Sequence, residues 1–153
     1  MPTQVAFYLL EPSEAVLEQP QAHLLAACQQ ASIYYRQQQK VFIYTKDQAS
    51  AEVIDELLWS FEPDSFVAHN LLGEGPKYGS PVEISWCAPS NRRPVLINLS
   101  NTVPEFAAQF SHIIDFVPAE ESLKQQARER FKQYRQRQFA IDTLPWPNDK
   151  ISD

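Results

Sequence analysis

The chain of 153 residues is long enough for one globular domain and too short for two of ordinary size. Hydrophobic residues make up 44% of it and charged residues 21%, a balance that favours a packed core over disorder. The net charge of −6 argues against a protein that coats nucleic acid. No basic leader opens the chain and no stretch approaches the roughly 20 apolar residues of a membrane span, so we expect a cytoplasmic protein without membrane contact.

The hydrophobic pattern alternates between strands and helices along the chain. Short apolar runs are typical of strands buried on both faces. Pro20 and Pro118 stand where helices begin, Asp47 can cap a third helix, and Thr102 and Glu105 have the spacing of a capping box. The expected strands are residues 5–10, 40–45, 66–69, 82–86, 95–99 and 113–117, and the expected helices are residues 20–38, 47–60, 102–110 and 118–138. This order predicts an α/β fold with a mostly parallel central sheet flanked by helices.

The chain shows no internal repeat, low-complexity tract or linker. We therefore expect a single domain over residues 1–142, followed by an extended C-terminal tail over residues 143–153. Cys28 and Cys87 lie far apart in the sequence, and we expect both to be reduced, buried thiols.

Motifs for catalysis, metals and nucleotides are incomplete. All three glycines lie within Gly73–Gly79, but Tyr78 occupies the position of the third glycine in the dinucleotide fingerprint, and no Walker lysine follows. His23, His69 and His112 have no second ligand at helical spacing. We expect no catalytic residue, no metal and no cofactor. A nucleotide-dependent enzyme that uses the glycine loop remains an alternative.

Basic residues concentrate in one segment near the C-terminus. Residues 1–121 carry six Lys/Arg against fifteen Asp/Glu, whereas residues 122–139 carry six Lys/Arg against one acid. Such a polarised charge distribution attracts an acidic partner.

Helical spacing arranges part of this segment into a stripe. At about 100° per residue, Lys124, Arg128, Phe131 and Arg135 share one side of the helix, and Lys132 lies about 40° beyond them. An aromatic ring among cations fits a short acidic peptide with one apolar anchor. A direct single-stranded DNA binder that stacks bases on Phe131 and Tyr134 is a second alternative.

Five stretches make the chain recognisable. Residues 114–135, IDFVPAEESLKQQARERFKQYR, closely resemble the chi subunit of bacterial DNA polymerase III. Residues 7–10 (FYLL), 55–59 (DELLW), 65–76 (SFVAHNLLGEGP) and 81–86 (PVEISW) also match this family. Because the matches follow one another through most of the chain, the resemblance covers the whole expected domain.

The resemblance implies a Rossmann-like sheet without a nucleotide site and a non-catalytic adaptor of the replication machinery. It implies two partners: the psi subunit, which tethers chi to the clamp loader, and the acidic C-terminal tail of the single-stranded DNA-binding protein, which ends in Pro-Phe. Some chi proteins also join an accessory helicase through the psi-binding surface. Direct DNA binding is not expected.

The resemblance also implies particular binding residues. For the tail of the single-stranded DNA-binding protein they are Val117, Lys124, Arg128, Phe131 and Lys132, and we add Arg135 from the helical spacing. The family often has Tyr in place of Phe131, so a hydrogen bond from that hydroxyl is lost here. The residues expected to bind psi are Leu58, Trp59, Pro63 and Phe66.

The residues of the tail site suggest separate roles. We expect Phe131 and Val117 to form a shallow pocket for the terminal Phe of the tail, and Arg128 to pair with its α-carboxylate. Lys124, Lys132 and Arg135 would hold Asp side chains upstream.

Overall fold

The computed structural model describes residues 3–10, 22–60, 69–71, 81–89, 93–118 and 121–145. Within these ranges the strands form one seven-stranded sheet in the order β3-β4-β2-β5-β6-β1-β7, and every neighbouring pair is parallel. The elements are β1 (Gln4–Leu9), α2 (Ala22–Arg36), β2 (Val41–Tyr44), α3 (Gln48–Ser60), β3 (His69–Leu71), β4 (Val82–Ser85), β5 (Val95–Asn98), the 3-10 helix η1 (Glu105–Gln109), β6 (His112–Val117), α4 (Glu121–Gln136) and β7 (Ala140–Pro145). The α/β prediction with a parallel sheet is confirmed.

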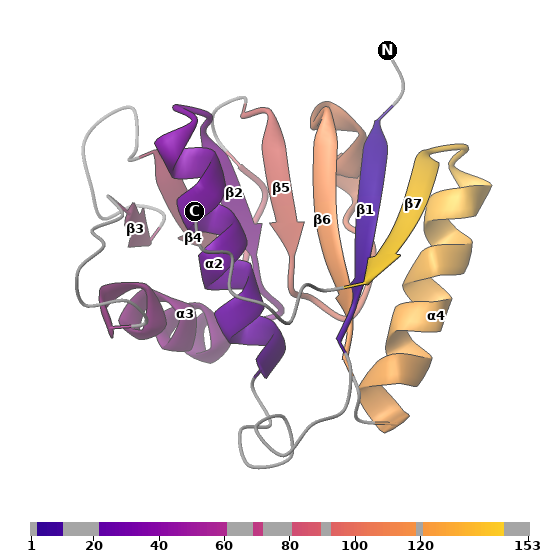
Figure 1. The fold of residues 1–153 in the computed structure, drawn as a ribbon, viewed down its shortest axis with the longest axis horizontal. Helices are drawn as coiled ribbons and strands as arrows, with labels where there is room; N and C mark the ends of the chain where they lie inside the picture. The colour runs from indigo at the N-terminus through magenta and orange to yellow at the C-terminus, as the bar shows by residue number, and fades with distance from the viewer. Residues whose placement is uncertain are drawn as a thin grey trace.

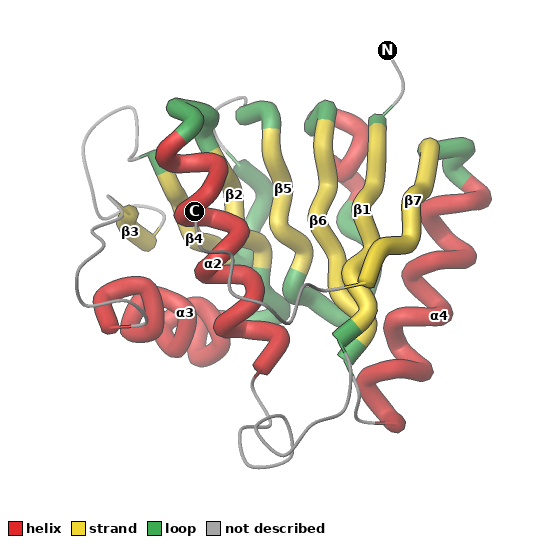
Figure 2. Tube along the Cα trace, viewed as in Figure 1, coloured by secondary structure: helices red, strands yellow, loops and turns green. Residues whose placement is uncertain are grey.

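Helices cover both faces of the sheet (Figures 1 and 2). Because side chains alternate along a strand, Val41 and Ile43 of β2 enter one core, and Phe42 between them enters the other. The first core is closed by α2 and α3, and the second by η1 and α4. Burial on both faces explains why a central strand such as β2 is a short apolar run without a polar side.

The second core fixes α4 against the sheet. The Phe7 ring of β1 lies 5.6 Å from the ring of Phe131 and 5.5 Å from the ring of Tyr134. Aromatic pairs at such distances contribute about 0.5–1.5 kcal/mol beyond the area that they bury. Phe7 therefore sets which side of α4 faces the sheet and which side is left to solvent.

The expected helix caps have different outcomes. The N–H of Ser50 donates to Asp47 Oδ1 at 2.8 Å, which confirms the predicted cap of α3. The capping box at Thr102 is wrong, because η1 begins after Pro104, whose backbone is extended and makes no side-chain cap. A proline holds the preceding residue in an extended conformation, so a helical turn cannot start before Pro104.

Strand β7 is not predicted by the sequence pattern. Gln138 adopts a left-handed conformation (φ 64°) at the end of α4, and the N–H of Phe139 donates back to the carbonyl of Tyr134. The chain thereby reverses into β7, which pairs with β1 and places Thr143 opposite Phe7. Residues 143–145 thus belong to the sheet. Whether a domain ends at residue 142 stays a prediction, and residues 146–153 lie outside the described part.

Three further predictions can be compared with the structure. The strand expected at residues 66–69 is observed as β3, His69–Leu71, and the Gly73–Gly79 loop lies outside the described residues. Cys28 is buried as expected, and burial raises the pKa of its thiol to about 12. Cys87 is exposed, contrary to expectation, and lies just beyond β4, where its N–H donates to the Ser85 hydroxyl. In the described residues no helix is long and apolar enough to cross a membrane.

Candidate functional site

A cavity of about 420 Å³ opens between α4 and the carboxyl ends of β1, β6 and β7. Its apolar lining consists of Phe7, Leu9, Leu10, Val117, Ala127 and Phe131, and its polar lining of Lys124, Arg128 and Thr143. We call this cavity the α4 pocket. Sheet register explains why distant segments meet there, since Leu9 of β1 pairs with Val117 of β6 and Phe7 pairs with Thr143 of β7.

The α4 pocket combines an apolar floor with a cationic rim. Phe7 is buried beneath the half-buried ring of Phe131, and Leu9 is one of three large hydrophobic residues exposed among the described residues. Lys124 and Arg128 stand one helical turn apart on α4 and line the same opening. Arg128 is exposed, and its Nη1 donates to Gln125 Oε1 at 3.1 Å. The pocket can bury an apolar group and pair with an anion beside it.

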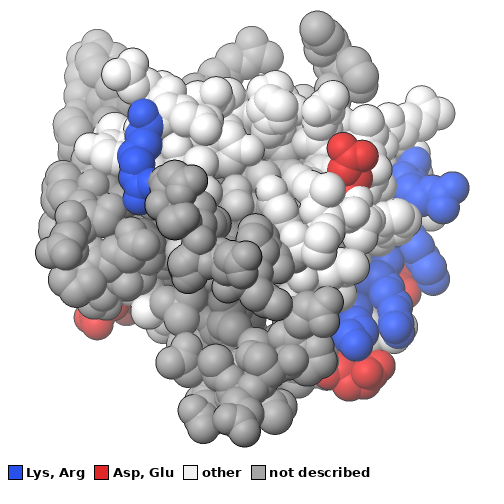
Figure 3. All heavy atoms as spheres, viewed as in Figure 1, with Lys and Arg blue, Asp and Glu red and all other residues white. Residues whose placement is uncertain are grey.

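The structure separates the six residues expected for the tail site into two groups. Val117, Lys124, Arg128 and Phe131 line the α4 pocket, whereas Lys132 and Arg135 do not. Lys132 Nζ lies 3.6 Å from Glu129 Oε2, and the two side chains are 69% and 56% exposed. Arg135 is exposed in the last turn of α4. Figure 3 shows Lys and Arg side chains gathered on the side of the molecule that α4 occupies, with some acids among them.

Sequence reasoning missed five residues of the α4 pocket: Phe7, Leu9, Leu10, Ala127 and Thr143. The first three lie in or beside a stretch that resembles the family, but only the sheet register brings them to α4. Thr143 belongs to β7, which the sequence pattern did not predict.

The residues expected to bind psi are described only in part. Leu58 is 2% exposed and packs in the first core, so its side chain offers no surface to a partner in this structure. Trp59 lies in the last turn of α3, but its side chain is outside the described part of the chain, as are Pro63 and Phe66. The psi-binding set therefore stays a prediction.

A buried polar network lies behind the α4 pocket. Arg130 of α4 pairs with Asp115 of β6 in a two-pronged contact, with Nε to Oδ2 and Nη2 to Oδ1 both at 2.9 Å. The Tyr134 hydroxyl donates to Asp115 Oδ2 at 2.8 Å, and Asn98 donates to that hydroxyl at 3.0 Å. The network links α4 to β5 and β6 in the interior of the protein.

Charge and burial act together in this network. Burial raises the pKa of the Tyr134 hydroxyl well above its usual range, so that it stays protonated and donates. Burial opposes the charge of Arg130, but the carboxylate of Asp115 outweighs this effect and raises the pKa of the guanidinium. Arg130 belongs to the basic segment of the sequence, but it is only 6% exposed and forms its ion pair inside the protein.

The fold and the α4 pocket define a class: a parallel α/β protein with a surface cavity suited to an anionic ligand that carries an apolar group. No group of three His, Cys, Asp or Glu that could hold a metal ion occurs among the residues described. The family model "DNA polymerase III chi subunit, HolC" matches residues 1–142. The chain belongs to this family, as the sequence resemblance predicted.

Curated relatives agree with this assignment. The chain is 42% identical to the DNA polymerase III subunit chi of Escherichia coli over 142 residues, which cover 92% of this chain and 96% of the relative. It is 46% identical to that of Haemophilus influenzae over 119 residues, covering 76% and 83%. It is 32% identical to that of Pseudomonas aeruginosa over 140 residues, covering 91% and 94%.

A solved structure of the T4 protein UvsW is similar in fold. The two superpose with a TM-score of 0.57 over 95% of this chain and 41% of UvsW, at 9% sequence identity. At such low sequence identity, the similarity shows only that the two proteins share an α/β fold.

Proposed function

We propose that the chain is a non-catalytic adaptor that grips the acidic C-terminal tail of the single-stranded DNA-binding protein and, through psi, links it to the clamp loader. The observation that carries the proposal is the α4 pocket, where Lys124 and Arg128 flank an apolar floor that includes Phe7 and Val117. Its volume of about 420 Å³ falls in the range of roughly 300–1,000 Å³ that is usual for ligand sites. An aromatic side chain with an adjacent carboxylate matches both parts of this cavity.

Each lining residue then has a role in holding the tail. The terminal Phe of the tail packs against Val117 and Phe131, and Arg128 pairs with its α-carboxylate. Lys124 supplies the second cation at the rim. Lys132 and Arg135 lie outside the α4 pocket and act on Asp side chains upstream in the tail, where solvent screens them.

Partner binding on the clamp-loader side is proposed from family resemblance. Psi contacts the region of Trp59, Pro63 and Phe66, with Leu58 supporting it from the core. An accessory helicase is a further partner for the same region.

Direct binding of single-stranded DNA is the weaker alternative. It requires accessible rings for base stacking, but Tyr134 is 0% exposed and its hydroxyl is bound to Asp115. The ring of Phe131 also packs against Phe7. Tyr134 is therefore not accessible to a base, and the half-buried ring of Phe131 alone does not make a stacking platform. The alternative of an enzyme that uses Gly73–Gly79 falls on residues outside the described part.

The proposal is tested by deleting the tail of the partner. The chain and the single-stranded DNA-binding protein are mixed and passed through a gel-filtration column, once with the full-length partner and once with a partner that lacks its last ten or so residues. We expect co-elution with the full-length protein only. Equal co-elution with both forms would place the contact elsewhere.

The two lysines of α4 offer a matched comparison. Lys124→Ala should weaken binding of a labelled tail peptide by about three- to tenfold, because Lys124 lines the α4 pocket and forms a charge-assisted contact there. Lys132→Ala should weaken it by no more than about fivefold, since exposed ion pairs contribute roughly 0–1 kcal/mol. Fluorescence polarisation at one fixed salt concentration measures both. If Lys132→Ala weakened binding more than Lys124→Ala, the peptide would bind nearer the C-terminal half of α4.

A further inference from the structure

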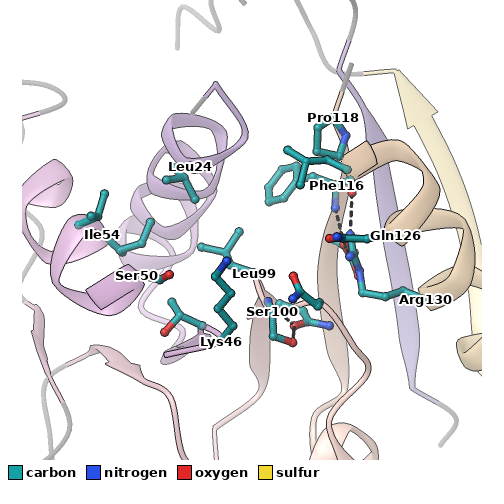
Figure 4. Close-up of a pocket in the computed structure, with 16 residues that line it drawn as sticks. Leu24, Lys46, Ser50, Ile54, Leu99, Ser100, Phe116, Pro118, Gln126 and Arg130 are labelled. Atoms are coloured by element: carbon teal, nitrogen blue, oxygen red, sulfur yellow. Dashed lines mark hydrogen bonds and ion pairs between the residues drawn. The ribbon is translucent and has the colours of Figure 1, made fainter. Parts of the chain in front are cut away.

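A second cavity, of about 260 Å³, opens at the carboxyl ends of β2, β5 and β6, on the other side of the N-terminal half of α4. Its lining includes Lys46, Ser50, Leu99, Phe116, Gln126 and Arg130. We call it the switch-point pocket. In Figure 4, Lys46 and Ser50 lie on the α3 side of this pocket, and Gln126 and Arg130 lie on the α4 side, with Leu99 and Ser100 between them.

The position of this pocket follows from the chain topology. β2 and β5 are neighbours in the sheet, but β2 continues into α3 on one face and β5 continues into η1 on the other. The two connections therefore diverge and leave a crevice at the strand ends. In open parallel α/β sheets, ligands bind in this kind of crevice.

The polar lining of the switch-point pocket favours an anion. Lys46 and Arg130 are its cations, and Asp115, which is ion-paired with Arg130, is its carboxylate. Asp115 is not available to a ligand, because Arg130, Tyr134 and the N–H of Phe116 all donate to it. Lys46 is therefore the cation of the lining that no lining carboxylate balances, although its charge also acts on the neighbouring carboxylate of Asp47.

Arg130 gives a second, independent indication. It is 6% exposed, and its Nε and Nη2 are bound to Asp115 and to the carbonyl of Phe116. Its Nη1 makes no hydrogen bond within the described part of the chain, although the residue lines the pocket. Nη1 is not one of the fully buried polar atoms that lack a partner among the described residues, so it can donate to an oxyanion in the pocket. The N-terminus of α3 is not the source of attraction, since Asp47 already caps it.

The rest of the lining combines apolar side chains with neutral polar ones, which are Thr45, Ser50, Asn98, Ser100, Asn101 and Gln126. Leu24, Val53 and Leu123 lie around the polar groups, and Val53 is 37% exposed although it is a large hydrophobic residue. A ligand that fills the pocket therefore carries an apolar or planar body beside its anionic group.

We propose that the switch-point pocket binds a small phosphate-bearing molecule of about the size of a nucleoside monophosphate. Its phosphate lies between Lys46 and Arg130, and its body rests on Val53 and Leu123. The site is separate from the α4 pocket, and no catalysis is involved. Neither the glycine loop nor the basic stripe indicates it in the sequence.

Nuclear magnetic resonance titration of the full-length chain tests the proposal. Adenosine 5′-monophosphate and inorganic phosphate are the probes, and adenosine and sodium chloride at matched ionic strength are the controls. We expect saturable shifts of the backbone amides of Lys46, Leu99 and Ser100, with dissociation constants in the range of about 0.1–10 mM. Adenosine and chloride should give no saturable shift at those amides.

Two variants separate this site from the proposed peptide site. Lys46→Gln should weaken the binding of adenosine monophosphate by at least about fivefold, and Arg128→Ala should leave it unchanged. Shifts that Lys46→Gln does not alter would overturn the proposal. So would an absence of saturable shifts with both phosphate probes, or the same shifts produced by the acidic tail peptide in the Arg128→Ala variant.

Discussion

Replacing Arg130 with alanine should lower the free energy of unfolding by about 3–5 kcal/mol, because the change leaves Asp115 as a buried charge without its partner. Asp115 is fully enclosed, and Arg130 makes the two-pronged contact that balances its charge. The same substitution removes the hydrogen bond from Nη2 to the carbonyl of Phe116. A loss of this size is a large fraction of the 5–15 kcal/mol or so that stabilises a typical domain.

Urea denaturation of the two proteins measures this loss. Arg135→Ala is the matched control, since Arg135 lies on the same helix but is exposed, and it should change stability by no more than about 0.5 kcal/mol. If Arg130→Ala were no more destabilising than Arg135→Ala, the buried pair would not hold α4 in place.

Replacing Arg128 with alanine should weaken binding of the acidic tail peptide by about ten- to a hundredfold. A hydrogen bond to a charged group contributes roughly 1.5–3 kcal/mol, which corresponds to this range of affinity. Arg128→Lys should recover only part of the loss, because an ammonium group cannot form the two parallel hydrogen bonds of a guanidinium with a carboxylate. Stability should hardly change, since Arg128 is exposed.

Isothermal titration calorimetry with the peptide measures these affinities. Lys40→Ala removes one exposed cation just before β2, away from the α4 pocket, and should leave binding within about twofold of the original. A similar loss in Lys40→Ala and Arg128→Ala would mean that overall charge, and not the pairing at Arg128, determines the affinity.

Much of the fold follows from local pattern. Apolar runs such as Val41–Tyr44 predict strands because burial on both sides leaves no polar face, and the alternation with helices predicts parallel order. Strand β7 does not follow from any such pattern, because only Ile141 of it is partly buried and it contains Asp142 and Pro145. Its pairing with β1 depends on the turn at Gln138, which takes a left-handed conformation that usually falls to glycine.

Helical spacing and the family resemblance together found part of the α4 pocket. Lys124, Arg128 and Phe131 recur at intervals of four and three residues, so their shared side could be predicted. Phe7 and Thr143 could not, because they reach the pocket through sheet register, which is a property of pairing between distant segments.

Arg130 shows a second limit of reading the sequence alone. It looks like one more cation of the basic segment, but in the structure it points inward to Asp115. Residues 114–135 contain both members of this pair, and nothing in their spacing shows that a loop and half a helix bring them together.

The most direct measurement compares two forms of one acidic peptide that ends in Pro-Phe, with a free α-carboxylate or with an amide in its place. The proposed contact predicts that amidation weakens binding by about tenfold or more, since Arg128 loses the charge that it pairs with. It also predicts that the two forms bind the Arg128→Ala variant almost equally, as expected of partners in one interaction. Equal affinities of both forms for the unmodified chain would contradict the assignment of the α4 pocket to the end of the tail.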